Sequence, residues 1–279
     1  MRLSLSTNWF AREVPVKARV EKALELGFGE LELGYSTTEE EGKEYLKLGD
    51  RIKIGSVHAF CPVPISAPSG HPELYALASL SKDARAIAKE NVKKSVEFAK
   101  AMGADTVVLH AGRVFAQGFF PWSNRVKARR KHGRRMVECV KETLAETVKI
   151  LEANQIVLGL ENMPYLEGFP MAEEWTELKE FGPWIKPWFD TGHWRVQECN
   201  KWTGAFADTE YSKLEFAGMH LNDVIDFNDD HFAPGGGKVD FKVYKEMMEK
   251  VPHVVMEPKS HVSEADLKKG VEIINDAVS

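Results

Sequence analysis

The sequence predicts a single (β/α)8 TIM barrel of the α/β class, with residues 1–279 forming one domain. Short apolar runs alternate with longer amphipathic segments along nearly the whole chain, and eight such pairs suit a parallel barrel covered by helices. A length of 279 residues and an apolar fraction of 43% allow a sizeable core. Neither a Gly/Ser-rich linker nor a charge block divides the chain. A doubly wound open sheet is the alternative arrangement of the same elements.

The expected strands are short apolar runs, and the expected helices carry apolar residues at spacings of three and four. The strands should cover residues 2–7, 30–35, 53–60, 105–112, 156–162, 187–192, 216–223 and 253–258. The clearest helices are expected at 16–27, 82–103, 133–154, 239–251 and 263–278. Gly27 and Gly103 end the first two of these helices, in the position of a helix C-cap.

The amino-acid composition indicates which kinds of partner and which cellular compartment to expect. The formal net charge of −5 argues against a general electrostatic attraction to nucleic acid. Three scattered cysteines without a CxxC pair fit a reducing compartment. The N-terminus lacks the features of a signal peptide, and no apolar run is long enough to cross a bilayer. We therefore expect a cytoplasmic protein without a membrane partner, and the sequence leaves the oligomeric state open.

Imidazole and carboxylate side chains stand where the predicted strands end. Because the C-terminal ends of barrel strands open onto one face, these groups should converge. Gathered carboxylates and imidazoles are costly to bury unless a cation is present. Nitrogen and oxygen donors without cysteine fit a divalent metal such as zinc, manganese or cobalt. The residues concerned are His58, His110, Glu161, Asp190, His193, His220 and Glu257.

Each of these residues has a simpler explanation when it is considered alone. A single histidine near a strand end is more often a satisfied polar group, and Asp190 could cap the helix that follows it. The predicted convergence is what favours a metal site, with Asn162 and Asn222 expected to orient the ligands. The remaining histidines were assigned to the surface or to packing, and they are His71, His132, His253 and His261.

The loop at 228–241 follows the seventh expected strand and adds two more donors. Asp229 and His231 form a D-x-H pair, and the run Gly235–Gly237 permits positive φ and close approach to a ligand. Asp, Asn and Gly are also ordinary turn formers, so a solvated turn is the simpler alternative. The position of the pair on the predicted rim favours a role in the site.

Seven segments carry a family resemblance: SVHAF, VVLHAG, GLENMP, FDTGH, GMHLND, DDHFAPGGG and VVMEP. Together they resemble the xylose-isomerase-like TIM-barrel superfamily, which holds sugar and sugar-phosphate isomerases and epimerases alongside endonuclease IV DNA-repair enzymes. The resemblance implies a metal site shared by both branches at Glu161, Asp190, His220 and Glu257. It implies further endonuclease-type ligands, and so one to three metal ions, at His58, His110, His193, Asp229 and His231.

Because sugar-handling relatives use some of the same residue types for substrate hydroxyls, the ligand set leaves the branch open. We favour a metal-dependent sugar isomerase or epimerase acting through an enediolate, with Glu161 and Glu257 as paired acid and base. His58 and His193 would hold substrate hydroxyls. Trp9 and Trp122 would wall the pocket, although core packing is the simpler role of any one aromatic residue. The expected partner is a small sugar or sugar phosphate.

The alternative is an endonuclease IV-like, zinc-dependent abasic-site endonuclease. The basic run 125–135, which begins at Arg125, could bind a substrate phosphate or DNA. Its simpler explanation is the solvated start of a helix with salt bridges to nearby glutamates. The acid-rich segment 36–50 and the apolar loop 61–80 disfavour DNA. A barrel that binds metal or sugar without catalysis is a third hypothesis.

Overall fold

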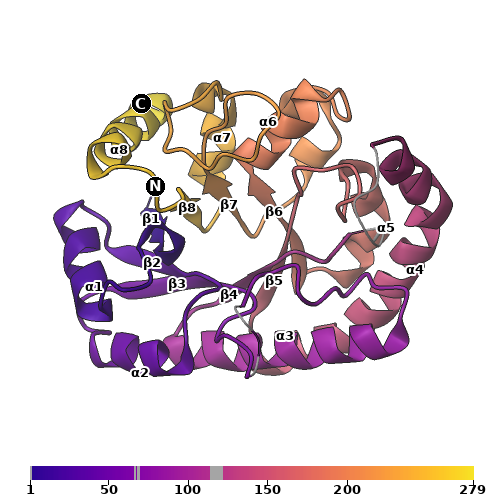
Figure 1. The fold of residues 1–279 in the computed structure, drawn as a ribbon, viewed down its shortest axis with the longest axis horizontal. Helices are drawn as coiled ribbons and strands as arrows, with labels where there is room; N and C mark the ends of the chain where they lie inside the picture. The colour runs from indigo at the N-terminus through magenta and orange to yellow at the C-terminus, as the bar shows by residue number, and fades with distance from the viewer. Residues whose placement is uncertain (1, 66, 68–69, 114–121) are drawn as a thin grey trace.

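The computed structural model describes residues 2–65, 67, 70–113 and 122–279. Within this range, eight parallel strands close into a barrel that is surrounded by helices (Figure 1). The strands follow one another around the barrel in chain order, and β1 pairs with β8 to close it. The predicted (β/α)8 barrel is confirmed, and the open-sheet alternative is excluded by this closure.

All eight expected strands are present, each slightly shorter than predicted or shifted along the chain. Their bounds are β1 Leu3–Ser6, β2 Glu30–Leu33, β3 Lys53–His58, β4 Thr106–Leu109, β5 Val157–Glu161, β6 Ile185–Asp190, β7 Gly218–Leu221 and β8 Val254–Met256. The helices are α1 Val16–Glu25, α2 Glu39–Lys47, α3 Lys82–Met102, α4 Trp122–Asn154, α5 Trp175–Leu178, α6 Thr191–Cys199, α7 Lys245–Lys250 and α8 Glu264–Val278.

Two helices differ from their predicted bounds. Helix α4 begins at Trp122 rather than at residue 133, because the Arg- and Lys-rich run before Gly133 consists of good helix formers. The basic run 125–135 therefore lies inside a helix. Helix α7 begins later than expected because a 3-10 helix, Phe241–Tyr244, precedes it.

In strand β2, successive side chains point alternately toward the helices and into the barrel. Leu31 and Leu33 belong to the hydrophobic layer between the strands and the helices. Glu30 and Glu32, which alternate with them, face the barrel interior, where each accepts a hydrogen bond from a serine of a neighbouring strand. Carboxylates can be buried at these positions because they have partners there.

Trp188 fills the middle of the barrel interior. It is fully buried and packs in a small cluster with Val108, Val255 and Ala217. A Cβ atom on Gly218 would lie 2.4 Å from the indole of Trp188, so only glycine fits beside this ring. The barrel interior around Trp188 is thus a packed core rather than a channel.

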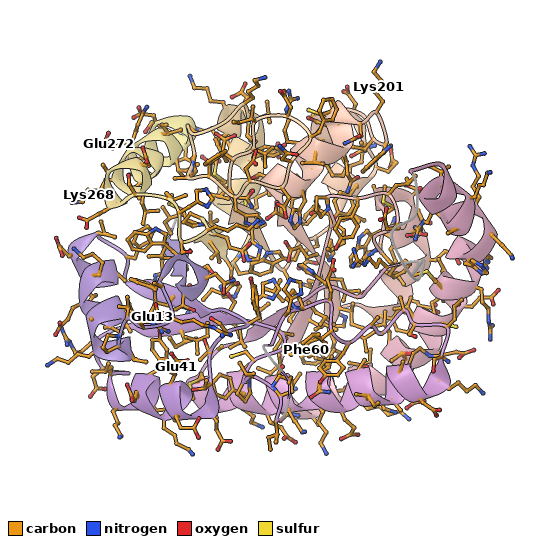
Figure 2. All side chains as sticks on the ribbon, in the orientation of Figure 1. Glu13, Glu41, Phe60, Lys201, Lys268 and Glu272 are labelled. Carbon is orange, nitrogen blue, oxygen red and sulfur yellow. The ribbon has the colours of Figure 1, made fainter. Side chains whose placement is uncertain are left out.

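Charged side chains lie on the outer surface of the helices. Lys201, Lys268 and Glu272 point outward at the edge of the molecule, whereas Phe60, in the loop that follows β3, is only 1% exposed (Figure 2). No helix among the described residues is long and apolar enough to cross a membrane.

Candidate metal centre

Four consecutive strands bring the expected metal donors to one end of the barrel. Glu161, Asp190 and His220 are the last or nearly the last residues of β5, β6 and β7, and Glu257 follows β8 directly. One donor atom from each of the four lies within 4.8 Å of the others. Nitrogen and oxygen ligands of a tetrahedral zinc ion lie about 3.4 Å apart, so the group would have to draw slightly closer to surround one cation.

Asp190 is held by hydrogen bonds that fix both its carboxylate and its backbone, whose carbonyl accepts from Asn162 Nδ2 at 3.1 Å. Its Oδ1 accepts from the backbone N–H of His193 at 2.7 Å, which caps α6, so the simpler prediction for this residue also holds. Its Oδ2 accepts from Asn222 Nδ2 at 2.5 Å, and its backbone N–H donates to Asn162 Oδ1 at 2.7 Å. Each carboxylate oxygen keeps a lone pair for a metal.

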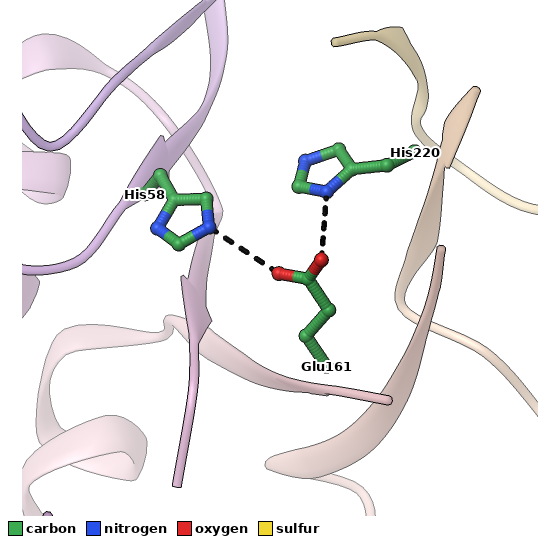
Figure 3. Close-up of side chains that lie close together, drawn as sticks. All are labelled: His58, Glu161 and His220. Carbon is green, nitrogen blue, oxygen red and sulfur yellow. Dashed lines mark hydrogen bonds and ion pairs between the residues drawn. The ribbon is translucent and has the colours of Figure 1, made fainter. Parts of the chain in front are cut away.

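Glu161 lies among four imidazoles, and His193 Nδ1 is 3.3 Å from its Oε1. Its Oε2 is 3.3 Å from His58 Nε2 and 3.1 Å from His110 Nε2. Its Oε1 is 3.3 Å from His220 Nδ1, so the carboxylate bridges His58 and His220 (Figure 3). One carboxylate shared by several imidazoles is an arrangement that can bridge two cations.

A second group of donors lies on the same rim. Donor atoms of His193, Asp229 and His231 lie within 4.8 Å of one another. Asp229 Oδ1 is 2.9 Å from His231 Nε2 and 3.4 Å from His193 Nε2. The D-x-H pair of the 228–241 loop therefore meets the histidine that follows β6, although the loop comes from a different part of the chain.

Backbone carbonyls orient three of these imidazoles, those of His58, His193 and His231. Each carbonyl requires an N–H, so the opposite ring nitrogen keeps its lone pair for a cation in the neutral ring. This is the tautomer that a metal ligand needs, and the donor set fits a divalent metal. The contacts are His58 Nδ1 to Ala59 O at 3.0 Å, His193 Nδ1 to Asn162 O at 2.7 Å and His231 Nδ1 to Glu257 O at 3.0 Å.

The two glutamates have opposite electrostatic environments. Burial alone would raise the pKa of Glu161, but His110 and His220 hold it well below its usual range. Burial raises the pKa of Glu257 despite the nearby His220 and His231. Paired carboxyl groups whose pKa values are pushed apart are suited to act as base and acid.

The pKa values of two histidines in the site are also shifted in opposite directions. Burial lowers the pKa of His110 to about 4, so this ring is neutral near pH 7. Burial would also lower the pKa of His193, but Asp190 and Asp229 raise it to about 10. Without a metal, the negative charge of the site's carboxylates is thus partly offset by a proton on His193, whereas His110 is neutral.

A cavity of about 490 Å³ opens above the donors, which is the usual size of a small-molecule pocket. His58, His110 and His193 line it beside Glu161 and Glu257. Sequence analysis missed several other lining residues, although each follows a strand end in the chain. They are Tyr35, His71, Arg113, Tyr165, Lys259 and His261.

Among the residues expected to bind substrate, Trp9 is not one of the described residues that line this cavity. The indole Nε1 of Trp9 donates to the backbone carbonyl of Val262 at 2.9 Å, which fixes the ring beside the loop that follows β8. Trp122 and Arg125 belong to α4, but their side chains lie outside the described residues.

Much of the basic run is paired with glutamates. Arg129 forms an ion pair with Glu174. Arg134 lies 2.7 Å from Glu177, and Arg135 lies 2.7 Å from Glu138. For these three arginines, the structure agrees with the simpler prediction of salt bridges on a helix.

The sequence pattern of the xylose isomerase-like TIM barrel family matches residues 20–277. The chain belongs to this family. The resemblance inferred from the seven strand-end segments is therefore confirmed. No curated protein matches the chain.

Solved structures of this family share the barrel. A D-tagatose 3-epimerase-like protein is 24% identical, with 100% of both chains covered and a TM-score of 0.72. D-psicose 3-epimerase from Clostridium cellulolyticum is 16% identical, with 100% of both chains covered and a TM-score of 0.71. A Thermus thermophilus protein soaked with ZnCl2 is 21% identical, with 99% of both chains covered and a TM-score of 0.63.

Proposed function

We propose that this chain is a divalent-metal-dependent sugar isomerase or epimerase that moves a proton at a carbon beside a carbonyl. The proposal rests chiefly on the close approach of Glu161 and Glu257, whose carboxylates both lie near His220 Nδ1, at 3.3 and 3.1 Å. Both glutamates line the same small-molecule cavity. The likeness to solved sugar epimerases supports the same chemistry.

The residues divide the chemical work between them. Glu161, Asp190, His220 and Glu257 would hold the metal, which when bound would polarise the substrate's carbonyl and favour an enediolate. Glu161, whose lowered pKa keeps it ionised, would be the base that removes the proton from carbon. Glu257, the group with the raised pKa, is suited to return a proton from the other side.

The remaining donors would bind the sugar. His58 and His193 line the cavity with one ring nitrogen turned away to a backbone carbonyl, so the other nitrogen can meet a hydroxyl. Arg113 and Lys259 line the same cavity and could meet a phosphate on a phosphorylated sugar. A small sugar or sugar phosphate is the substrate class that this lining suits best.

Proton exchange with solvent tests the proposal directly. Metal-reconstituted protein would be incubated in D2O with a panel of ketoses and their phosphates, and products followed by NMR. We expect a new epimer or isomer that carries deuterium at the reacting carbon. Glu257→Gln should lower the rate at least about 100-fold. No deuterium incorporation with any sugar of the panel would contradict the proposal.

A second candidate is phosphodiester hydrolysis, as in an abasic-site endonuclease. It is favoured by the second donor group at His193, Asp229 and His231, since two groups together could hold more than one cation. Elemental analysis combined with an incision assay on abasic duplex DNA separates the two candidates. Three bound zinc ions and strand incision would favour the nuclease, whereas one exchangeable ion without incision favours the isomerase.

A non-catalytic barrel would behave differently from both. A barrel that only binds its ligand has no turnover, so neither Glu161→Gln nor Glu257→Gln could lower one. Detection of any Glu257-dependent turnover therefore rules out this third hypothesis.

A further inference from the structure

Glu32 is a buried carboxylate that lies behind the candidate metal centre. It stands on β2 with no exposed surface, and its two oxygens lie 3.1 and 3.2 Å from His220 Nε2. Ser56 on β3 donates its hydroxyl hydrogen to Oε2 over 2.8 Å. Because an unpaired carboxylate is costly to bury, these contacts account for its presence inside the barrel.

His220 is contacted on both ring nitrogens, and its two sides differ. Nδ1 faces the gathered donors Glu161 and Glu257, at 3.3 and 3.1 Å. Nε2 faces Glu32. A carboxylate at Nε2 requires an N–H there, so in the neutral ring the lone pair is on Nδ1 and points toward the metal-type donors.

We infer that Glu32 is a positioning residue for the metal site: it fixes His220 as the Nε2–H tautomer and aims the Nδ1 lone pair at the cation. An anionic partner behind a metal-bound imidazole also makes the ring a stronger donor. Glu32 belongs to none of the donor groups and acts through His220 alone. The inference rests on the proposed metal dependence and extends it to a residue that need not touch metal or substrate.

Glu32 differs from the groups that orient the other imidazoles. The Nδ1 atoms of His58, His193 and His231 meet neutral backbone carbonyls, which a side-chain substitution cannot remove. His193 Nδ1 also lies 3.3 Å from Glu161 Oε1 but keeps its backbone carbonyl at 2.7 Å, whereas His220 Nε2 contacts only the Glu32 carboxylate among the described residues. Its orientation therefore depends on one side chain, and a substitution there can be read directly in metal binding.

The same strand supplies a matched control. Glu30 also faces the barrel interior, accepts a hydrogen bond from a serine, Ser4, at 2.8 Å, and lies 3.8 Å from a histidine, His253 Nδ1. His253 precedes β8, so this group lies at the opposite end of the barrel from the donors. Glu30→Gln thus disturbs a buried carboxylate, serine and histidine in the same barrel without touching the metal centre.

Metal affinity and an NMR signal together test the inference. Zinc affinity of the full chain would be measured by competition with a chelating dye for wild type, Glu32→Gln, Glu32→Ala and Glu30→Gln. We expect affinity to fall about 10-fold in Glu32→Gln and toward 100-fold in Glu32→Ala, and to stay within about two-fold of wild type in Glu30→Gln. In the zinc-loaded protein, the His220 Nε2–H resonance should move in both Glu32 variants and stay in place in Glu30→Gln.

The outcomes separate this inference from the proposed function. Wild-type zinc affinity in both Glu32 variants, or an equal loss of zinc affinity in Glu30→Gln, overturns the role of Glu32. Either result leaves the proposed metal dependence standing. A wild-type chain that binds neither zinc, manganese nor cobalt overturns the proposed metal dependence together with this role. If the Glu32 variants do not fold, Ser56→Ala can be used instead, because it keeps the Glu32 carboxylate but removes the hydroxyl that donates a hydrogen bond to it. A zinc affinity a few-fold weaker then supports the inference, and unchanged affinity overturns it.

Discussion

Asp190 and His220 are register partners on the neighbouring strands β6 and β7, and Asp190 Oδ2 lies 3.8 Å from His220 Nδ1. Both side chains point into the barrel. Because side chains alternate along a strand, a slip of one residue in this register would turn one of them toward the helices. The pairing of β6 with β7 therefore places two metal-type donors side by side.

Metal binding should stabilise the fold, because the donors of the candidate centre gather only in the folded chain. We expect zinc, manganese or cobalt added to chelator-treated protein to raise its melting temperature by about 5–10 °C at a hundredfold excess over Kd. Differential scanning fluorimetry measures this shift, with calcium as the comparison ion. An unchanged melting temperature with all three transition metals would count against the site.

Gly192→Ala should weaken metal binding through Asn222. A Cβ atom at position 192 would lie 1.9 Å from Asn222 Oδ1, so the amide that donates to Asp190 must move. We expect at least about 10-fold weaker metal binding and a loss of about 1–3 kcal/mol in the free energy of unfolding.

Gly204→Ala is the control for this substitution, because a Cβ atom at position 204 would have no neighbour within 4 Å. Isothermal titration calorimetry and urea unfolding compare the two variants. Equal metal affinities for them would show that Asn222 does not support Asp190.

The stability of the barrel should depend on pH through the group at its N-terminal end. Burial would lower the pKa of His253, but Asp105 and Glu30 raise it to about 9. Burial would raise the pKa of Glu30, but His253 and Lys53 lower it to about 2. The stabilisation from His253 is complete below its unfolded pKa, near 6.5, and is lost as pH rises through about 9.

Glu30 behaves in the opposite sense. Its stabilisation is complete above its unfolded pKa, near 4.5, and is lost as pH falls toward about 2.

Urea unfolding at pH 6 and pH 9.5 tests the contribution of His253. Wild type should lose about 1–3 kcal/mol more of its free energy of unfolding than His253→Asn over this range. Identical losses in the two proteins would contradict the assignment to His253.

Arg129 should contribute to folding rather than to ligand binding. It pairs with Glu174, and the two side chains are only 11% and 13% exposed. Arg129→Ala leaves the Glu174 carboxylate largely buried without its partner, which we expect to cost about 1–3 kcal/mol. Arg130→Ala on the exposed face of the same helix should change stability by less than about 0.5 kcal/mol. Chemical unfolding of both variants decides this, and equal values would refute the structural role of Arg129.

The strand ends were the most predictable part of the molecule, because apolar runs and the polar residues after them are local patterns. Glu161, Asp190, His220 and Glu257 could be found in this way, since each lies in the last two residues of a buried strand or directly after it. Glu32 could not be found so easily. Its strand reads Glu-Leu-Glu-Leu, which is also the pattern of a strand with one face in water.

The apolar pattern placed the start of α4 at residue 133, and only the simpler explanation of the basic run 125–135 put a helix start there. Arg and Lys favour helices, but a basic run carries no apolar stripe that would mark its buried face. The glutamates that pair with Arg129 and Arg134 lie on a distant segment, 172–178, so the pairing depends on the fold.

By itself the sequence determined the class of fold, the order of the strands and the kinds of donor at their ends, because these follow from local periodicity and residue chemistry. Closure of the barrel decided which donors meet and which nitrogen of each histidine faces the site. His220 shows why: its two ring nitrogens lie between Glu32 of β2 and Glu257 after β8, and these are brought together only when β1 pairs with β8.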